Sequence, residues 1–137
     1  MASAIASIDI AAPANAVWRV IGGFGSLPDW LPYIPTSELT EGGRVRHLIN
    51  PEGGVIVERL MSFDERRRAY SYHILQAPFP VRDYFSTLQV EEIADTRSRV
   101  EWSGQFTPTT VGSGEASLLF RRIYEDGLRA LAERFRS

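Results

Sequence analysis

The residues Arg44–Gln76 read RVRHLINPEGGVIVERLMSFDERRRAYSYHILQ, and this stretch indicates the fold. Three runs in it are rich in β-branched and aromatic residues and are predicted to be strands: Arg44–Asn50, Val55–Phe63 and Ala69–Gln76. The connections between them carry turn-forming residues, Pro-Glu-Gly-Gly and Asp-Glu-Arg-Arg. Because connections this short cannot make a parallel crossover, we expect the three strands to form an antiparallel meander.

The same pattern of apolar runs and turns continues on both sides of this stretch. Alternating Ile5, Ile8 and Ile10 indicate a first strand that ends before Pro13. Three further strands are predicted over Thr36–Thr40, Tyr84–Ile93 and Arg99–Pro108.

Helical periodicity is found in three segments. A helix is predicted over Ala14–Ile21, and a short one over Ser26–Trp30 with Ser26 as its N-cap. In Glu115–Phe135, apolar residues recur at spacings of three and four, which is typical of a long amphipathic helix. Residues 1–137 are therefore expected to form a single α+β domain, in which six or seven antiparallel strands curve around the long C-terminal helix.

Hairpin register indicates which side chains face inward. With symmetric turns, the pairs expected to lie opposite each other are Arg46 with Glu58, Leu48 with Ile56, Leu60 with Tyr72, Tyr84 with Phe106, and Leu88 with Trp102. Every one of these pairs joins even-numbered residues. Because most even positions are apolar and most odd positions are polar, the even face of the sheet is predicted to be the inner one.

Arg46 and Glu58 are the charged residues that this register places on the inner face. A buried charge is costly unless it is paired, and an Arg opposite a Glu across a hairpin meets that demand. Two interpretations follow: a core salt bridge that fixes the hairpin register, or a polar group that orients a carbonyl or carboxylate of a ligand. The two histidines, His47 and His73, fall on the outer face.

Composition excludes several classes of site. The chain has no cysteine and two histidines, so thiolate chemistry is absent and a transition-metal site is not expected. All 15 basic residues are Arg, which excludes a Schiff-base lysine. The net charge of -2 gives no reason to expect nucleic-acid binding. We find neither a signal peptide nor an apolar run that could span a bilayer, so a cytoplasmic protein without cofactor, metal or stable membrane insertion is expected.

The chain resembles the SRPBCC superfamily of START-like and polyketide cyclase/dehydrase-type proteins, which have the helix-grip fold. The residues that carry the resemblance follow one another along nearly the whole chain: Ala12–Trp18, Phe24–Pro32, Glu58–Leu60, Phe63–Asp64, Tyr70–Tyr72, Pro80–Tyr84, Val100–Trp102, Phe106 and Tyr124–Leu131. The resemblance implies a seven-stranded sheet that grips the C-terminal helix around a hydrophobic cavity.

Three functions are compatible with a hydrophobic cavity that contains a few polar residues. The first is binding or transport of a hydrophobic, lipid- or polyketide-like small molecule; the second is a polyketide cyclase- or aromatase-like enzyme that uses polar cavity residues; the third is a protein-interaction domain. An apolar pocket of several hundred Å³ is predicted between the inner sheet face and the long helix. The candidate ligand-binding residues are Trp30, Tyr33, Arg46, Leu48, Glu58, Leu60, Tyr72, Tyr84, Leu88, Trp102, Phe106, Ile123 and Gly127.

Gly127 interrupts the apolar stripe of the long helix, where a glycine costs about 1 kcal/mol relative to alanine. Space for a bound molecule would explain this glycine, and so would close contact between helix and sheet.

Overall fold

A computed structural model describes residues 1–136. Its elements are β1 (Ala2–Ile10), α1 (Ala14–Ile21), α2 (Leu27–Trp30), β2 (Thr36–Thr40), the 3-10 turn η1 (Glu41–Gly43), β3 (Val45–Ile49), β4 (Val55–Asp64), β5 (Ala69–Gln76), β6 (Val81–Ala94), β7 (Arg97–Pro108) and α3 (Ser113–Arg134). The strands form one seven-stranded antiparallel sheet in the order β1-β7-β6-β5-β4-β3-β2.

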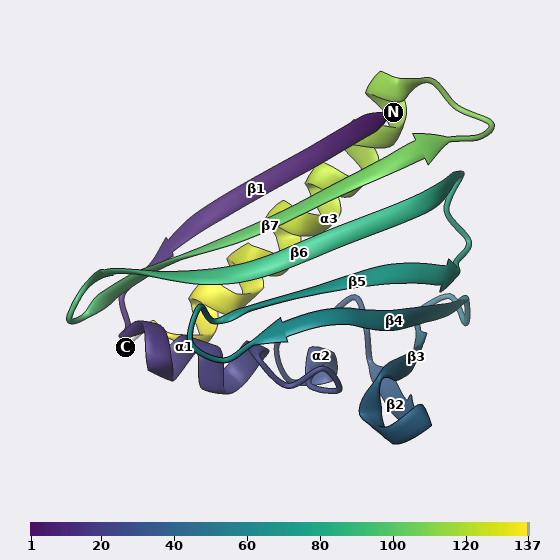
Figure 1. Ribbon diagram of the computed structural model, residues 1–137. Coiled ribbons are helices and arrows are strands. Elements are labelled where there is room, and N and C mark those ends of the chain that lie inside the picture. Colours follow the sequence, from purple (N-terminus) through teal and green to yellow (C-terminus); the bar gives the residue numbers. More distant parts are fainter. Residues whose placement is uncertain (137) are drawn as a thin grey trace.

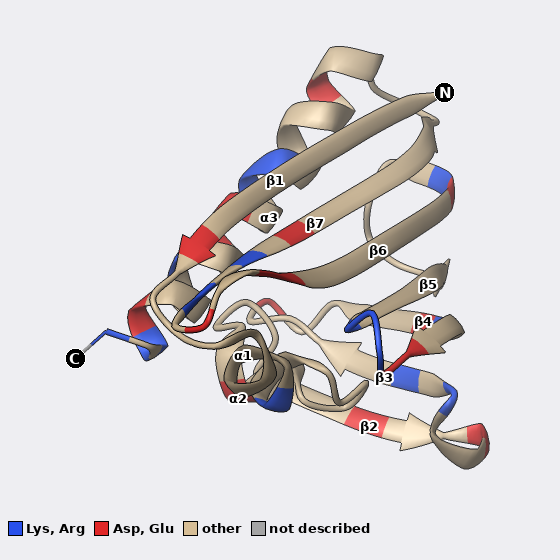
Figure 2. Ribbon diagram, turned by 60° about the vertical axis from the view of Figure 1, so that its left-hand side comes forward, with Lys and Arg blue, Asp and Glu red and all other residues tan. Residues whose placement is uncertain are grey.

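The predicted α+β helix-grip fold is confirmed. Figure 1 shows α3 lying behind the sheet, across the half that contains β1, β7 and β6, while α1 and α2 lie at the lower end of the molecule. Acidic and basic residues are both scattered over the sheet, the turns and α3 (Figure 2). Within residues 1–136, the helices are too short or too polar to cross a membrane.

The register of the sheet follows the prediction in its central part. Arg46 pairs with Glu58 and Leu48 with Ile56. Further along the sheet, Leu60 pairs with Tyr72, and Leu88 pairs with Trp102. Each pair joins two even positions, so these side chains share one face of the sheet. That face is the inner one, because all of them except the half-buried Leu60 are buried.

Four bulges interrupt the ladders between β4 and β5 and between β6 and β7, and two of them alter the predicted placement of inner-face residues. In β6, Asp83 and Tyr84 together oppose Phe106, so the predicted one-to-one pair of Tyr84 with Phe106 is wrong. Asp83 has a positive φ of 53°, and the two aromatic rings still stack with centroids 6.0 Å apart. In β4, Met61 is the extra residue, and it turns the odd-numbered Phe63 onto the inner face. The Phe63 ring centroid there lies 5.5 Å from that of Trp18.

The ends of several elements differ from the predicted ones. β6 begins at Val81 rather than Tyr84, because Val81 and Arg82 continue the ladder beyond the bulge and pair with Pro108 and Thr107. α3 runs from Ser113 to Arg134, and β7 begins at Arg97. Ser26 does occupy the N-cap position of α2, but its hydroxyl donates to the carbonyl of Gly23 and makes no capping bond to the helix.

Small residues bring α3 close to the sheet. Ala2 and Ala4 are the buried positions at the start of β1, where α3 packs. Gly104 of β7 lies beside Tyr124 of α3, and a Cβ atom at Gly104 would overlap the Tyr124 hydroxyl oxygen. The consequence is a dense core on this side of the sheet, filled from α3 by Phe120 and Tyr124, which are 2% and 1% exposed.

Candidate ligand-binding site

The inner face of the sheet, α3 and the segment around α2 border a small cavity of about 40 Å³, which we call the inner cavity. The prediction of an interior pocket of several hundred Å³ is therefore wrong in size. The side chains that line the inner cavity are Leu27, Leu31, Tyr33, Ile34, Arg46, Leu48, Ile56, Glu58, Tyr72, Ile74, Phe79, Tyr84, Trp102, Phe120, Ile123 and Tyr124.

Aromatic rings fill the space that the prediction left empty. The ring centroids of Trp102 and Tyr124 are 4.6 Å apart, and those of Tyr84 and Phe120 are 4.9 Å apart. Phe106 adds a further contact with Phe120 at 4.8 Å. At such distances aromatic rings are in direct contact and gain from both burial and ring geometry. These rings were predicted to line an open pocket, but in the structure they pack on one another.

The buried ion pair forms as predicted, with Arg46 1% and Glu58 6% exposed. Arg46 Nε donates to Glu58 Oε1 at 2.7 Å, and Nη2 lies 2.7 Å from the same oxygen. Arg46 Nη1 donates to the Phe24 carbonyl oxygen at 3.0 Å and to the Tyr70 hydroxyl at 3.2 Å. Each of the three guanidinium nitrogens therefore has a protein acceptor.

Aromatic rings surround the Arg46 guanidinium as well. Its carbon lies 4.1 Å from the centroid of Phe24 and 4.7 Å from that of Tyr72. Such cation–π contacts partly replace the hydration that a buried charge loses. For Arg46, this geometry favours the interpretation as a core salt bridge, because its donors are used within the fold.

Burial changes the acid–base properties of the site. Desolvation raises the pKa of the Glu58 carboxyl group, and the charge and hydrogen bonds of Arg46 act in the opposite direction. Desolvation also raises the pKa of the Tyr72 and Tyr84 hydroxyls well above the usual value, so both stay protonated at neutral pH. The inner cavity thus holds one buried carboxylate and neutral phenols.

A small hydrogen-bond network connects the phenols to the sheet. The Trp102 indole Nε1 donates to the Tyr72 hydroxyl at 3.2 Å and to Ser86 Oγ at 3.1 Å. The hydroxyls of Tyr84 and Tyr124 form a hydrogen bond with each other. Sequence reasoning missed Tyr124 and Ser86. The spacing of four from Phe120 to Tyr124 on the helix was a signal for the first, and even parity on β6 was a signal for the second.

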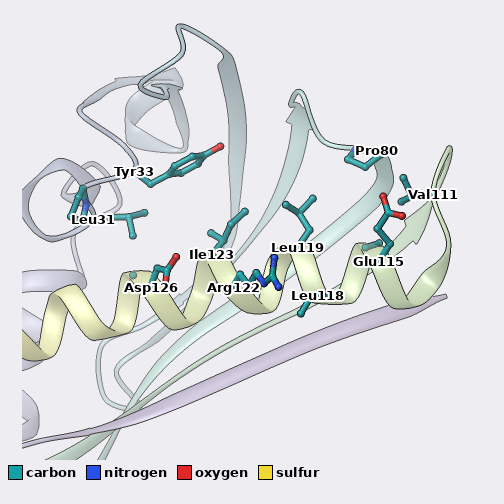
Figure 3. Close-up of a pocket in the computed structure, with 13 residues that line it drawn as sticks. Leu31, Tyr33, Pro80, Val111, Glu115, Leu118, Leu119, Arg122, Ile123 and Asp126 are labelled. Atoms are coloured by element: carbon teal, nitrogen blue, oxygen red, sulfur yellow. The ribbon is translucent and has the colours of Figure 1, made fainter.

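A larger hollow, the outer groove, lies between α3 and the loops that face it. Its volume is about 610 Å³. Figure 3 shows Leu31 and Tyr33 at one end, Pro80 and Val111 at the other, and Leu119 and Ile123 projecting from α3 between them. Leu31, Tyr33 and Ile123 line both the outer groove and the inner cavity, so these three side chains separate the two spaces.

The predicted site residues are divided among three locations. The inner cavity is lined by Tyr33, Arg46, Leu48, Glu58, Tyr72, Tyr84, Trp102 and Ile123, and the outer groove by Tyr33, Ile123 and Gly127. Neither space is lined by Trp30, Leu60, Leu88 or Phe106, which pack within the core. Leu60, Leu88 and Phe106 do lie on the predicted inner face of the sheet, and the rings of Trp30 and Phe106 pack against Trp102 and Phe120.

Gly127 is explained by close packing. A Cβ atom at this position would come within 2.5 Å of Leu31 Cδ1 and 3.0 Å of Trp102 Cζ3. The helix therefore approaches both the α2–β2 connection and the sheet at this residue.

The histidines lie away from both spaces. His47 Nε2 is 3.0 Å from the Thr40 hydroxyl, and His73 Nδ1 is 3.1 Å from the Tyr84 carbonyl oxygen on the outer face. Among residues 1–136, no three His, Asp or Glu side chains gather in a way that could hold a metal ion.

The similarities to known proteins agree with this architecture. Residues 1–136 match the family described as polyketide cyclase / dehydrase and lipid transport. No curated protein matches the sequence. The solved structure of the protein XoxI from Bacillus cereus is 56% identical, with a TM-score of 0.97 over 98% of this chain and 96% of that chain.

Two more distant solved structures show the shared fold. The Zhui aromatase/cyclase from Streptomyces sp. R1128 is 21% identical, with a TM-score of 0.79 over 96% of this chain and 92% of that one. A START superfamily protein from Mycobacterium smegmatis is 15% identical, with a TM-score of 0.81 over 97% and 96%. Together with the seven-stranded sheet around α3, the family match over the whole described chain leads to one conclusion: this protein belongs to the polyketide cyclase/dehydrase and lipid-transport family.

Proposed function

We propose that this protein binds a hydrophobic small molecule, whose body lies in the outer groove and whose end enters the inner cavity. The observation that carries the proposal is the shared lining: Leu31, Tyr33 and Ile123 face both spaces. Movement of these three side chains would join the two spaces. The family description, which includes lipid transport, supports an apolar ligand.

The outer groove has the size and chemistry of a small-molecule site. Its volume of about 610 Å³ lies within the usual range for such sites. Leu31, Pro80, Val111, Leu119 and Ile123 supply apolar walls. Burial of a ligand against these walls would contribute roughly 25 cal/mol per Å² of apolar surface before the cost of association.

The proposal is tested with a neutral fluorescent probe, N-phenyl-1-naphthylamine, and a matched pair of variants. Leu119→Gln places an amide in the outer groove, whereas Leu75→Gln makes the same change at a side chain on the other face of the sheet, 55% exposed. We expect Leu119→Gln to weaken binding about tenfold or more, which corresponds to the loss of one buried leucine, and Leu75→Gln to leave it unchanged. Equal affinities in the two variants, with both melting near the parent temperature, would contradict the proposal.

An enzymatic function is the second candidate, because a buried carboxylate with a raised pKa lies beside phenolic hydroxyls. Glu58 would act as a general base, and Tyr72 would polarise a carbonyl group by donating a hydrogen bond. The similarity to a structure named as an aromatase/cyclase makes this reaction class worth testing. Incubation with a linear poly-β-ketone, followed by mass spectrometry, would show ring closure with loss of water; recovery of unchanged substrate would favour binding alone.

A further inference from the structure

We propose that the ligand carries a hydroxyl group at the end that enters the inner cavity, where this hydroxyl donates to Glu58 and accepts from Tyr72. The inference rests on the proposed function, because it specifies the chemistry of the ligand at that same site. The inference predicts that this protein binds hydroxylated apolar molecules more tightly than carboxylic acids, ethers or hydrocarbons of the same size.

Arg46 does not supply the polar contact. Its nitrogens already donate to Glu58, to the Phe24 carbonyl and to the Tyr70 hydroxyl. Only the second N–H of Nη2 has no acceptor within residues 1–136, and a carboxylate that approached it would be repelled by the Glu58 carboxylate beside it. The basic member of the buried pair is therefore not the group that recognises a ligand.

Glu58 offers an acceptor that the fold leaves open. Both bonds from Arg46 reach Oε1, and no group within residues 1–136 donates to Oε2. Glu58 lines the inner cavity, where about 8% of its side-chain surface is accessible. Glu58 Oε2 is not among the fully buried atoms that lack a partner, so it remains accessible, and a ligand that supplies a donor there gains a hydrogen bond to a charged group.

Tyr72 offers the complementary donor. Its oxygen accepts a hydrogen bond from Trp102 Nε1, but within residues 1–136 no acceptor takes its own proton. Tyr72 is 2% exposed and lines the same cavity as Glu58. A hydroxyl oxygen placed between them would accept from Tyr72 and donate to Glu58 Oε2, which satisfies both groups at once.

The size of the inner cavity restricts what reaches these two groups. A volume of about 40 Å³ is far below that of a complete small-molecule site. The inner cavity can therefore take the slender end of a molecule, such as a hydroxymethyl group, while the rest of the molecule lies in the outer groove. A primary alcohol with an unbranched apolar chain has this shape.

The test compares four probes of similar size: 1-octanol, its isomer heptyl methyl ether, n-octane and octanoate. Affinities are measured by displacement of N-phenyl-1-naphthylamine. The ether can accept from Tyr72 but has no hydrogen to donate to Glu58, so we expect 1-octanol to bind about tenfold or more tightly than the ether, as for a hydrogen bond to a charged group. Octanoate is expected to bind more weakly than 1-octanol.

Two variants assign the effect to the two residues. Tyr72→Phe should weaken 1-octanol and the ether about threefold to tenfold and leave n-octane unchanged; Trp102 keeps its second partner, Ser86, in this variant. Glu58→Gln should remove most of the preference for 1-octanol over octanoate. If Glu58→Gln fails to fold, Tyr72→Phe and the four probes still decide the matter.

The possible outcomes separate this inference from the proposed function. Equal affinities for 1-octanol, the ether and n-octane would overturn the hydroxyl inference and leave hydrophobic binding intact. Tighter binding of octanoate than of 1-octanol would also overturn it. Displacement by none of the four probes would count against the proposed function itself.

Discussion

The hydroxyl of Tyr124 on α3 occupies the space that Gly104 leaves open on β7, and it bonds there with the hydroxyl of Tyr84. Together with the close approach at Gly127, this contact determines how closely the helix lies against the sheet. It also explains a glycine in the middle of a long strand, a position where glycine is otherwise unfavourable.

Gly104→Ala is expected to destabilise the protein. The new methyl group would overlap the Tyr124 hydroxyl, and overpacking of this kind costs about 1–3 kcal/mol in the free energy of unfolding. Urea denaturation measures the loss. The double variant Gly104→Ala/Tyr124→Phe, which removes the overlapping oxygen, should recover part of it; a double variant less stable than Gly104→Ala alone would refute the explanation.

Arg46→Met should be among the most destabilising changes on the inner face. It leaves the Glu58 carboxylate buried without its cation, and breaking a buried ion pair costs about 3–5 kcal/mol. Replacement of both partners, Arg46→Met/Glu58→Leu, should cost much less than Arg46→Met alone, because no unpaired charge remains. Denaturation midpoints of the parent and the two variants give the comparison, and a double variant as unstable as Arg46→Met would contradict it.

The destabilisation caused by Arg46→Met should depend on pH. Burial already raises the pKa of Glu58 above its ordinary value of 4.5, and removing Arg46 removes the group that opposes this shift. A carboxyl group whose pKa is higher in the folded state stabilises the fold when protonated, and this contribution is lost as the pH rises through the folded-state pKa. The variant should therefore lose more stability at pH 8 than at pH 5.

A pH-independent difference between the parent and Arg46→Met would contradict this expectation. Arg46→Met/Glu58→Leu is the matched control, since it has no carboxyl group at this position to titrate. Its difference from the parent should vary less between the two pH values.

Ile123→Ala should speed ligand exchange. Ile123 is one of the three side chains between the outer groove and the inner cavity, and truncation opens a path between them. Stopped-flow mixing with N-phenyl-1-naphthylamine should show faster association and faster dissociation than in the parent. Leu75→Ala, on the other face of the sheet, serves as the control. Unchanged rates in Ile123→Ala would mean that this side chain does not limit entry.

Much of the fold could be predicted because it follows from local periodicity. Turn symmetry placed Arg46 and Glu58 opposite each other, and parity placed this pair on the inner face and both histidines on the outer face. The bulges at Met61 and Asp83 could not be predicted in this way, because an extra residue in a strand leaves no distinct mark on an alternating pattern.

The site was harder to predict than the sheet. The size of the inner cavity depends on how aromatic rings from different elements pack on one another. Trp102 of β7, for example, packs on Tyr124 of α3. Register arithmetic treats only neighbouring strands, so it identified Tyr72 and Tyr84 and omitted Tyr124. It also could not show that the Arg46 donors would be used by Phe24 and Tyr70, which lie far away in the sequence.

The pairing of β1 with β7 has a consequence for how the chain folds. Ala2 lies opposite Phe106, so the first strand finds its neighbour about 100 positions later in the sequence. Contacts of such long range slow folding, because the entropy of closing the loop is lost before the pairing is gained. During synthesis on a ribosome, β1 is made before β7 and α3. Ile8 and Ile10 therefore stay exposed until those two elements have been made and can cover them. The apolar side chains of β1 are therefore open to premature association until β7 and α3 cover them.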